Sequence, residues 1–208
     1  MPGPAIPRVA TRQMTMWRAR MGLIFAAVGI VWLVTALACT GHLTPRTLTL
    51  CSMLGASALI LCLALLRRAS RLPAQAISPE QNARIRRIVV AVNILEWVAV
   101  ATAFAVLMLV HLPEYIPTAA GIIIGLYLYP IAGALRAPLH TVTATLLVTW
   151  NALALGLVSR WRQVSIGAAG TGTILLASAA VTLGWAMWRT RQTDDLIAVV
   201  TQADTAIS

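Results

Sequence analysis

Charged residues are scarce in this sequence of 208 residues, and lysine is absent altogether. Only 11% of the residues are charged, whereas a typical soluble domain has about 25%. Apolar residues make up 59% of the chain, and the mean hydropathy is +0.82. A soluble fold of this length could not bury so much apolar surface, so the composition excludes a soluble domain.

Motifs for soluble chemistry are missing as well. The sequence has no glycine-rich phosphate loop, no nucleophile elbow and no CxxC motif, and we favour a protein that is not an enzyme. Its three histidines lack metal-ligand spacing such as H-E-x-x-H, so we expect no metal ion and no cofactor. The net charge of +10 would suit nucleic acid, but the arginines gather at the edges of apolar runs, and we expect no such partner.

Six apolar stretches are long enough to cross a bilayer as helices. A hydrocarbon core of about 30 Å needs roughly 20 apolar residues, because each backbone polar group must find its hydrogen bond within the helix. The stretches are approximately 21–39, 48–66, 88–112, 116–135, 139–158 and 164–188. The sequence therefore predicts an all-α polytopic transmembrane bundle of about six helices.

Arginines in the loops predict the orientation of the chain, because cytoplasmic loops are rich in basic residues. Four arginines lie in the N-terminal segment, six lie between the second and third spans, and Arg189 and Arg191 follow the sixth span. We therefore expect both termini in the cytoplasm. Arg160 and Arg162 disagree, because they fall in a loop that this scheme places outside. The Ala-rich composition, with arginine in place of lysine, suggests a bacterial inner membrane.

The predicted organisation is one membrane domain with short cytoplasmic segments. The N-terminal segment is 1–20, the six-helix domain is 21–189 with a cytoplasmic linker at 67–87, and the tail is 190–208. The chain can also be written as three parallel hairpin repeats, in which Trp32, Trp97 and Trp150 each lie midway along the first helix of a pair. Three hairpins of similar length would often show such a correspondence by chance, so the repeat is left open.

The first span has a second interpretation. Arg18 and Arg20 precede an apolar run that ends in Ala36-Leu37-Ala38, and this order imitates a secretory signal. Cleavage of residues 1–38 is therefore left open. A disulfide between Cys39 and Cys51 is also left open, although free cysteines, which behave as small apolar residues, are favoured.

Glu96 lies deep within the third span. It is nine residues beyond Arg87, which at 1.5 Å of rise per residue places it roughly 13 to 14 Å into the hydrocarbon, near the midplane. An acidic side chain at this depth costs about 3 kcal/mol, so we expect Glu96 to face the bundle interior and to be neutral or paired. Asn93, Tyr127 and Asn151 reach the same depth and are its candidate partners.

Two interpretations of these four polar residues remain open. They can form a structural network that fixes helix packing, as in a structural or partner-binding membrane protein. They can instead form a binding or proton-relay site, because ionisable residues inside membranes are commonly functional. The second interpretation implies a proton-coupled carrier of a small solute or cation. A lipid-modifying enzyme with Glu96 as general acid or base is least favoured.

Glycine and proline mark packing faces in the fourth and sixth spans. Gly121 and Gly125 have GxxxG spacing, which lets another helix approach closely, and Pro130 removes a backbone donor and should bend the same helix. Gly170 belongs to a glycine-rich stretch of the sixth span. We expect all four to serve helix packing. The lipid bilayer is the expected partner, and a homo-oligomer is left open.

Two stretches resemble small uncharacterised bacterial integral membrane proteins. One is His111-Leu112-Pro113-Glu114, and the other is Gly-Leu-Tyr-Leu-Tyr-Pro-Ile-Ala at 125–132. In that family a Glu-bearing helix precedes a Leu-Pro loop and a helix with the pattern Gly-Leu-His-Phe-Leu-Pro-Leu-Ala. Tyr127 and Leu128 stand here where the family has histidine and phenylalanine. The resemblance covers about the third to the fifth span, and it implies no activity.

Overall fold

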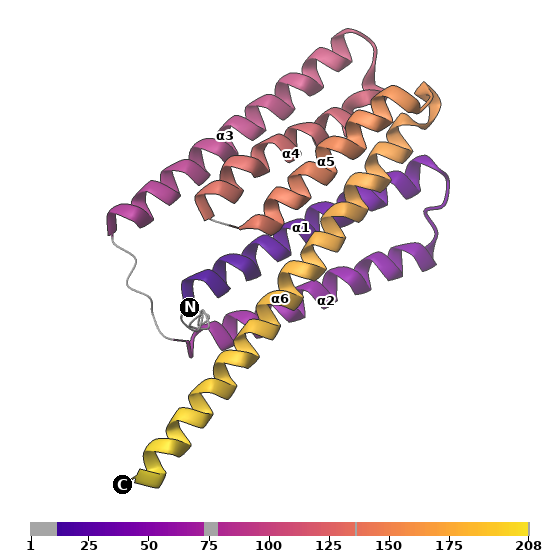
Figure 1. Ribbon diagram of the computed structural model, residues 1–208. Coiled ribbons are helices and arrows are strands. Elements are labelled where there is room, and N and C mark those ends of the chain that lie inside the picture. Colours follow the sequence, from indigo (N-terminus) through magenta and orange to yellow (C-terminus); the bar gives the residue numbers. More distant parts are fainter. Residues whose placement is uncertain (1–11, 73–78, 136, 208) are drawn as a thin grey trace, which may run out of the picture.

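Six α-helices form the described part of the chain. The computed structural model describes the backbone of residues 12–72, 79–135 and 137–207, and the side chains of 12–72, 83–135 and 137–193. The helices are α1 (Arg12–Cys39), α2 (Pro45–Ala69), α3 (Pro79–Leu109), α4 (Ile116–Leu135), α5 (Pro138–Leu157) and α6 (Gln163–Ile207). Short 3-10 turns, η1 (Pro113–Tyr115) and η2 (Arg160–Arg162), precede α4 and α6. All six helices are long and apolar enough to cross a membrane, which confirms the predicted all-α transmembrane class (Figure 1).

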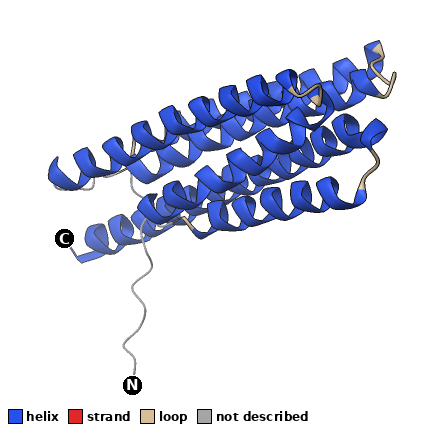
Figure 2. Cartoon of the chain, turned by 90° about the horizontal axis from the view of Figure 1, so that it is seen from above, coloured by secondary structure: helices blue, strands red, loops and turns tan. Residues whose placement is uncertain are grey.

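The first and last helices lie at the centre of the bundle. α1 packs along α6, α2 packs against both, and α5 and α4 lie on the other side of α6. α3 packs chiefly against α4, and no residue in its most apolar stretch is buried. Figure 2 shows the helices running along roughly one direction, so consecutive helices alternate between the two ends of the bundle. α3 is therefore a peripheral helix.

Small residues explain the close approach of α1 and α6. Gly22, Ala26 and Gly29 are buried along one face of α1 at spacings of four and three residues. Gly29 faces Gly172 of α6. A Cβ added to Gly172 would lie only 2.8 Å from the carbonyl oxygen of Gly29. Helices in lipid associate through such close packing, because the surrounding acyl chains are as apolar as the helices themselves. This contact between α1 and α6 joins the first and the last transmembrane helix of the chain.

One end of the bundle is strongly basic. The starts of α1, α3 and α5 and the end of α2 lie at this end, together with Arg189 and Arg191 of α6. Among the arginines that the structure describes, only Arg46, Arg160 and Arg162 lie at the opposite end. This excess of basic residues is what the predicted orientation, with the first end in the cytoplasm, requires. We call it the inner end, and the opposite one the outer end.

Helical structure extends beyond several predicted boundaries. α1 begins at Arg12, within the predicted N-terminal segment, and residues 1–11 lie outside the described part. α2 and α3 take up both flanks of the predicted linker at 67–87, of which 73–78 are not described. α6 has 45 residues, or about 67 Å at the usual helical rise, and runs without a break through the segment predicted as a tail. Its C-terminal part projects beyond the other helices (Figure 1).

The three hairpins of the proposed repeat have different surroundings. Trp32 on α1 packs against the hydrophobic core, whereas Trp97 on α3 is 75% exposed. Trp150 on α5 donates a hydrogen bond from Nε1 to the carbonyl oxygen of Ile166. The first helices of the three pairs are thus a central helix, a peripheral helix and a helix between two neighbours.

Candidate functional site

Asn151 of α5 is fully buried where α4, α5 and α6 meet. Its Nδ2 donates to the carbonyl oxygen of Leu147 at 2.9 Å and to Oγ1 of Thr171 at 3.0 Å, while its Oδ1 accepts from the Thr171 hydroxyl at 3.3 Å. Gly121 of α4 makes room for this pair, because a Cβ there would overlap Nδ2 of Asn151. The site is thus a hydrogen-bonded pair from two helices that is closed by a glycine from a third.

Gln163 closes the same interface near the outer end. The last carbonyl groups of a helix lack partners within the helix. Nε2 of Gln163 donates to the carbonyl oxygens of Ala154 and Val158, at 2.7 and 2.9 Å, and its Oε1 accepts from the hydroxyl of Thr118 at 3.3 Å. The first residue of α6 therefore satisfies the end of α5 and is joined to α4. These contacts hold the three helices together without leaving an open polar site.

Thr143 and Ser178 form the next contact towards the inner end, where the Thr143 hydroxyl donates to Oγ of Ser178 at 2.9 Å. His140 of α5 and Thr182 of α6 lie further towards the inner end. His140 is eleven residues from Asn151, and Thr182 is eleven residues from Thr171, a spacing that returns to nearly the same face of each helix. Both side chains are buried, and the His140 ring lies 5.4 Å from that of Phe25. In the described part of the chain, Nδ1 of His140 and Oγ1 of Thr182 have no hydrogen-bond partner.

Thr143 and Thr182 give a matched pair of predictions for the free energy of unfolding. Thr182→Val should raise the free energy of unfolding slightly or leave it unchanged, because it removes a buried hydroxyl that has no partner. Thr143→Val should lower it by about 1 kcal/mol, because the bond to Ser178 is lost. Thermal unfolding of both variants in one detergent compares the two effects. A larger loss for Thr182→Val than for Thr143→Val would contradict this assignment.

Glu96 lies on the face of α3 that packs against α4. The half-buried residues of α3 recur at spacings of three and four, as expected for one side of a helix. They are Ile85, Ile88, Val89, Val92, Glu96, Ala99, Val100, Ala103 and Leu107. Within the described residues, the Glu96 carboxyl has neither a hydrogen-bond donor nor a cation as partner. The ion pair found among these residues joins Arg160 to Glu114 at the outer end.

The four residues predicted as one polar cluster do not form a hydrogen-bonded network in the described part of the chain. Asn93 is exposed, Tyr127 is half-buried on α4, and the Asn151 amide is bonded to Thr171 and Leu147. Asn151 therefore belongs to the interface of α5 and α6, whereas Glu96 belongs to the groove between α3 and α4. A role for these residues in binding or proton relay stays a prediction.

The residues predicted to serve helix packing lie at different kinds of position. A Cβ on Gly125 would lie 2.7 Å from Cγ2 of Val148 on α5, and a Cβ on Gly170 would overlap the ring of Trp150. Pro130 is exposed, and α4 continues past it to Leu135. Gly125 and Gly170, like Gly121, thus border α5 closely, whereas Pro130 is exposed and does not lie in a buried contact.

Arg160, which the positive-inside rule left unexplained, has an ion-pair partner at the outer end. Its Nε donates to the carboxylate of Glu114 in η1, and its Nη2 donates to the carbonyl oxygen of His111 at 3.0 Å. The loop before α6 is thereby tied to the loop before α4. The charge of Arg160, which the predicted orientation places outside, is thus neutralised by an acidic residue of the neighbouring loop.

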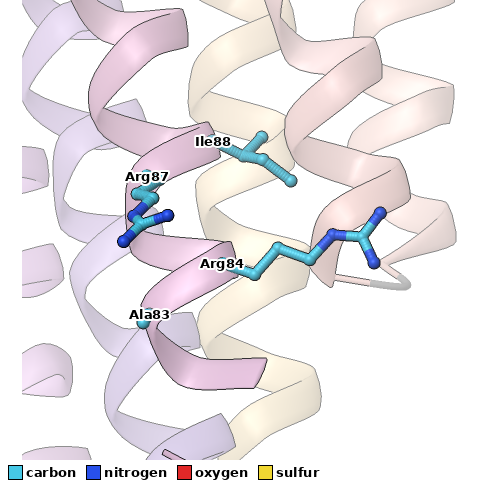
Figure 3. Close-up of a pocket in the computed structure, with 4 residues that line it drawn as sticks. All are labelled: Ala83, Arg84, Arg87 and Ile88. Atoms are coloured by element: carbon cyan, nitrogen blue, oxygen red, sulfur yellow. The ribbon is translucent and has the colours of Figure 1, made fainter. Parts of the chain in front are cut away.

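Two shallow hollows follow the inner half of α3. One is lined by Ala83, Arg84, Arg87 and Ile88, of which Arg84 and Ile88 point to one side of the helix (Figure 3). The other is lined by Arg86, Arg87, Val90, Ala91 and Ile94, and Glu96 lines neither. The described residues bring no three metal-binding side chains together, and all three cysteines are free.

Comparison with known proteins gives no match: no family model, curated protein or solved structure is similar to this chain. The resemblance of its third to fifth spans to small bacterial membrane proteins therefore stays a prediction. The function must be inferred from the geometry of the chain itself.

Proposed function

We propose that this six-helix membrane protein binds a transmembrane helix of another protein along α3, and that it acts in a bacterial inner membrane as a partner-binding protein. The observation that carries this proposal is the surface of α3. The helix has no buried residue in its most apolar stretch and packs chiefly against α4, yet it carries Asn93 and Glu96 at mid-membrane depth.

Polar groups at that depth favour a partner. An acidic side chain near the bilayer centre costs about 3 kcal/mol, and the described residues offer Glu96 no donor or cation. A second helix that lies along the edge of the groove between α3 and α4, and that brings a hydrogen-bond donor or a cation to this level, would remove that cost. Trp97, which is 75% exposed, lies on the Asn93 side of α3 and would supply apolar contact area beside the polar pair.

The charges along α3 indicate what kind of helix would fit. Arg86 lies seven residues before Asn93, about two helical turns towards the inner end on the same side of α3, and lines one of the two hollows. A second copy of the chain, packed parallel through this side of α3, would set Arg86 against its own counterpart, and like charges repel. We therefore infer a different protein, with a donor at mid-membrane and acidic residues at its cytoplasmic flank.

A photo-crosslinker at position 97 tests this proposal in living cells. With benzoylphenylalanine in place of Trp97, we expect a crosslink to a transmembrane segment that carries a mid-membrane donor and an acidic cytoplasmic flank, identified by tandem mass spectrometry of the joined peptide. Adding Glu96→Leu should reduce the yield about three- to tenfold, the loss expected from one hydrogen bond in a membrane. The same probe at Leu155, an exposed residue of α5, is the matched control.

Three outcomes would contradict the proposal. Crosslinks from position 97 to lipid alone would mean that this side of α3 faces the bilayer. Crosslinks to the chain itself would indicate a homo-oligomer. An unchanged yield in the Glu96→Leu background would mean that the carboxyl does not contribute to the contact.

Proton-coupled transport is the second candidate function. It is favoured by one observation, the half-buried Glu96 carboxyl in the groove between α3 and α4. On this alternative, Glu96→Gln abolishes uptake or efflux of a small solute or cation by proteoliposomes under a proton gradient, and the crosslink at position 97 is absent. Unchanged transport in Glu96→Gln would eliminate it.

A further inference from the structure

We propose that a phospholipid with two phosphate groups, as in cardiolipin, binds at the inner end of α3, where Arg84 and Arg87 bind its phosphates. The site is the larger of the two hollows along α3, a shallow depression of about 610 Å³ lined by Ala83, Arg84, Arg87 and Ile88. It is supported by the positions of the two arginines, by the charge around them and by the apolar surface that follows them.

Two arginines border this hollow at different places. Arg84 and Ile88 are four residues apart and share a side of α3, and Arg87, three residues from Arg84, lies on the neighbouring side. Figure 3 shows the side chains of Arg84 and Arg87 extending in different directions from the helix. Because both arginines line one hollow, a headgroup with two phosphate groups can present one phosphate to each guanidinium.

The charge around the hollow favours an anion. Neither Arg84 nor Arg87 has an ion-pair or hydrogen-bond partner among the residues whose side chains are described. Glu96, the described acidic residue of α3, lies nine residues beyond Arg87 on the face towards α4. In the sequence, residues 79–88 hold three arginines and one acidic residue, Glu80. The inner part of α3 therefore keeps an excess of positive charge.

The position of the hollow favours a lipid over a soluble diphosphate. Arg87 precedes Glu96 by nine residues, roughly 13 to 14 Å of helix, so the hollow lies at the inner boundary of the hydrocarbon, where headgroups lie. Towards mid-membrane, Ile88, Ala91 and Leu95 follow at spacings of three and four, and Ala91 and Leu95 are exposed. An acyl chain can lie along this apolar track while the arginines bind the anionic headgroup.

This lipid and the proposed partner helix occupy different sides of α3. Arg86 is two residues from Arg84, and residues two apart on a helix do not face each other. Asn93 and Trp97, which belong to the partner contact, follow Arg86 at spacings of seven and four residues and share its side. Loss of the lipid therefore leaves the partner contact in place, and a crosslink from position 97 reports on the partner alone.

Native mass spectrometry of the full chain in detergent, with equal amounts of cardiolipin, phosphatidylglycerol and phosphatidylcholine, tests the site. We expect the wild-type chain to retain cardiolipin over phosphatidylglycerol, which has one phosphate, and both over phosphatidylcholine, which has no net charge. Arg84→Gln and Arg87→Gln should each weaken cardiolipin retention about fivefold, the equivalent of about 1 kcal/mol for one basic residue near a membrane surface. Arg20→Gln and Arg67→Gln are matched controls, because both residues are exposed at the inner end and line neither hollow, and each should change retention less than twofold.

Arg84→Lys separates charge from folding, because it keeps the cation and should keep most of the cardiolipin retention. A loss in Arg84→Lys as large as that in Arg84→Gln would contradict binding through the charge at this position. Millimolar pyrophosphate should leave the lipid in place, and its displacement by pyrophosphate would mean that the ligand is a soluble diphosphate. Equal retention of cardiolipin and phosphatidylglycerol by the wild-type chain would exclude a ligand with two phosphates, and equal losses in the target and control variants would overturn the site.

Discussion

Gly172→Ala is expected to lower the melting temperature of the detergent-solubilised protein by about 5 to 10 °C. A Cβ at this position would lie 2.8 Å from the carbonyl oxygen of Gly29 and 2.9 Å from the backbone nitrogen of Leu33. Both contacts are with backbone atoms, so no rotamer change can relieve them, and α1 and α6 must move apart. Such overpacking typically costs about 1 to 3 kcal/mol, and each kcal/mol shifts the midpoint by about 2 to 4 °C in a chain of this size.

Gly184→Ala is the matched control for this prediction. Gly184 lies on the same helix, is exposed, and has no atom within 4 Å of an added Cβ. Alanine is also the better helix former by roughly 0.5 to 1 kcal/mol, so this variant should unfold at the wild-type temperature or slightly above it. Size-exclusion profiles after heating give both midpoints. Equal midpoints for the two variants would mean that α1 and α6 are not in close contact.

Most of the fold could be predicted from the sequence, because the number of helices depends on lengths of apolar sequence alone. All six apolar stretches correspond to helices in the structure. Boundaries were less accurate where polar sequence continues as a helix. α6 runs to Ile207, and the signal for this was available, since neither glycine nor proline occurs after Gly184.

Neighbouring helices could not be predicted in the same way. The rise per residue gives the depth of a side chain in the membrane, and on that basis Glu96, Tyr127 and Asn151 share one level. Depth does not tell which helices are neighbours or how each one is turned about its axis. The structure turns Asn151 towards α6 and leaves α3 beside α4, so residues at one depth belong to different interfaces.

The central pairing of α1 with α6 cannot be predicted for a similar reason. The sequence predicts packing faces from the glycines of the fourth and sixth spans, but not from Gly22 and Gly29 of the first span. Their spacing with Ala26 suits close packing, but no local pattern indicates that a helix at the start of the chain packs against the last one. The hydrogen bonds of Gln163 were equally invisible, because they depend on where α5 ends relative to the start of α6.

Gly121→Ala should also destabilise the protein strongly, by about 2 to 4 kcal/mol. The added methyl group would overlap Nδ2 of Asn151 and lie 2.7 Å from Oγ1 of Thr171, so it would separate a buried pair that joins α5 to α6. The cost combines overpacking, about 1 to 3 kcal/mol, with the loss of membrane hydrogen bonds worth about 0.6 to 1.7 kcal/mol. Gly133→Ala on the same helix, where nothing lies within 4 Å, should have no such effect.

A compensating substitution shows whether Asn151 is the group that Gly121 accommodates. Asn151→Ala removes the overlapping amide, so the Gly121→Ala/Asn151→Ala double variant should be more stable than Gly121→Ala alone. The double variant should remain less stable than the wild-type protein, because the Asn151→Ala substitution removes the hydrogen bonds to Thr171 and Leu147. Thermal midpoints of the four proteins form a double-mutant cycle, in which neighbouring residues show a coupling free energy of about 0.5 to 3 kcal/mol. Strictly additive effects would mean that Gly121 and Asn151 do not touch, and the junction of α4, α5 and α6 would then have to be packed differently.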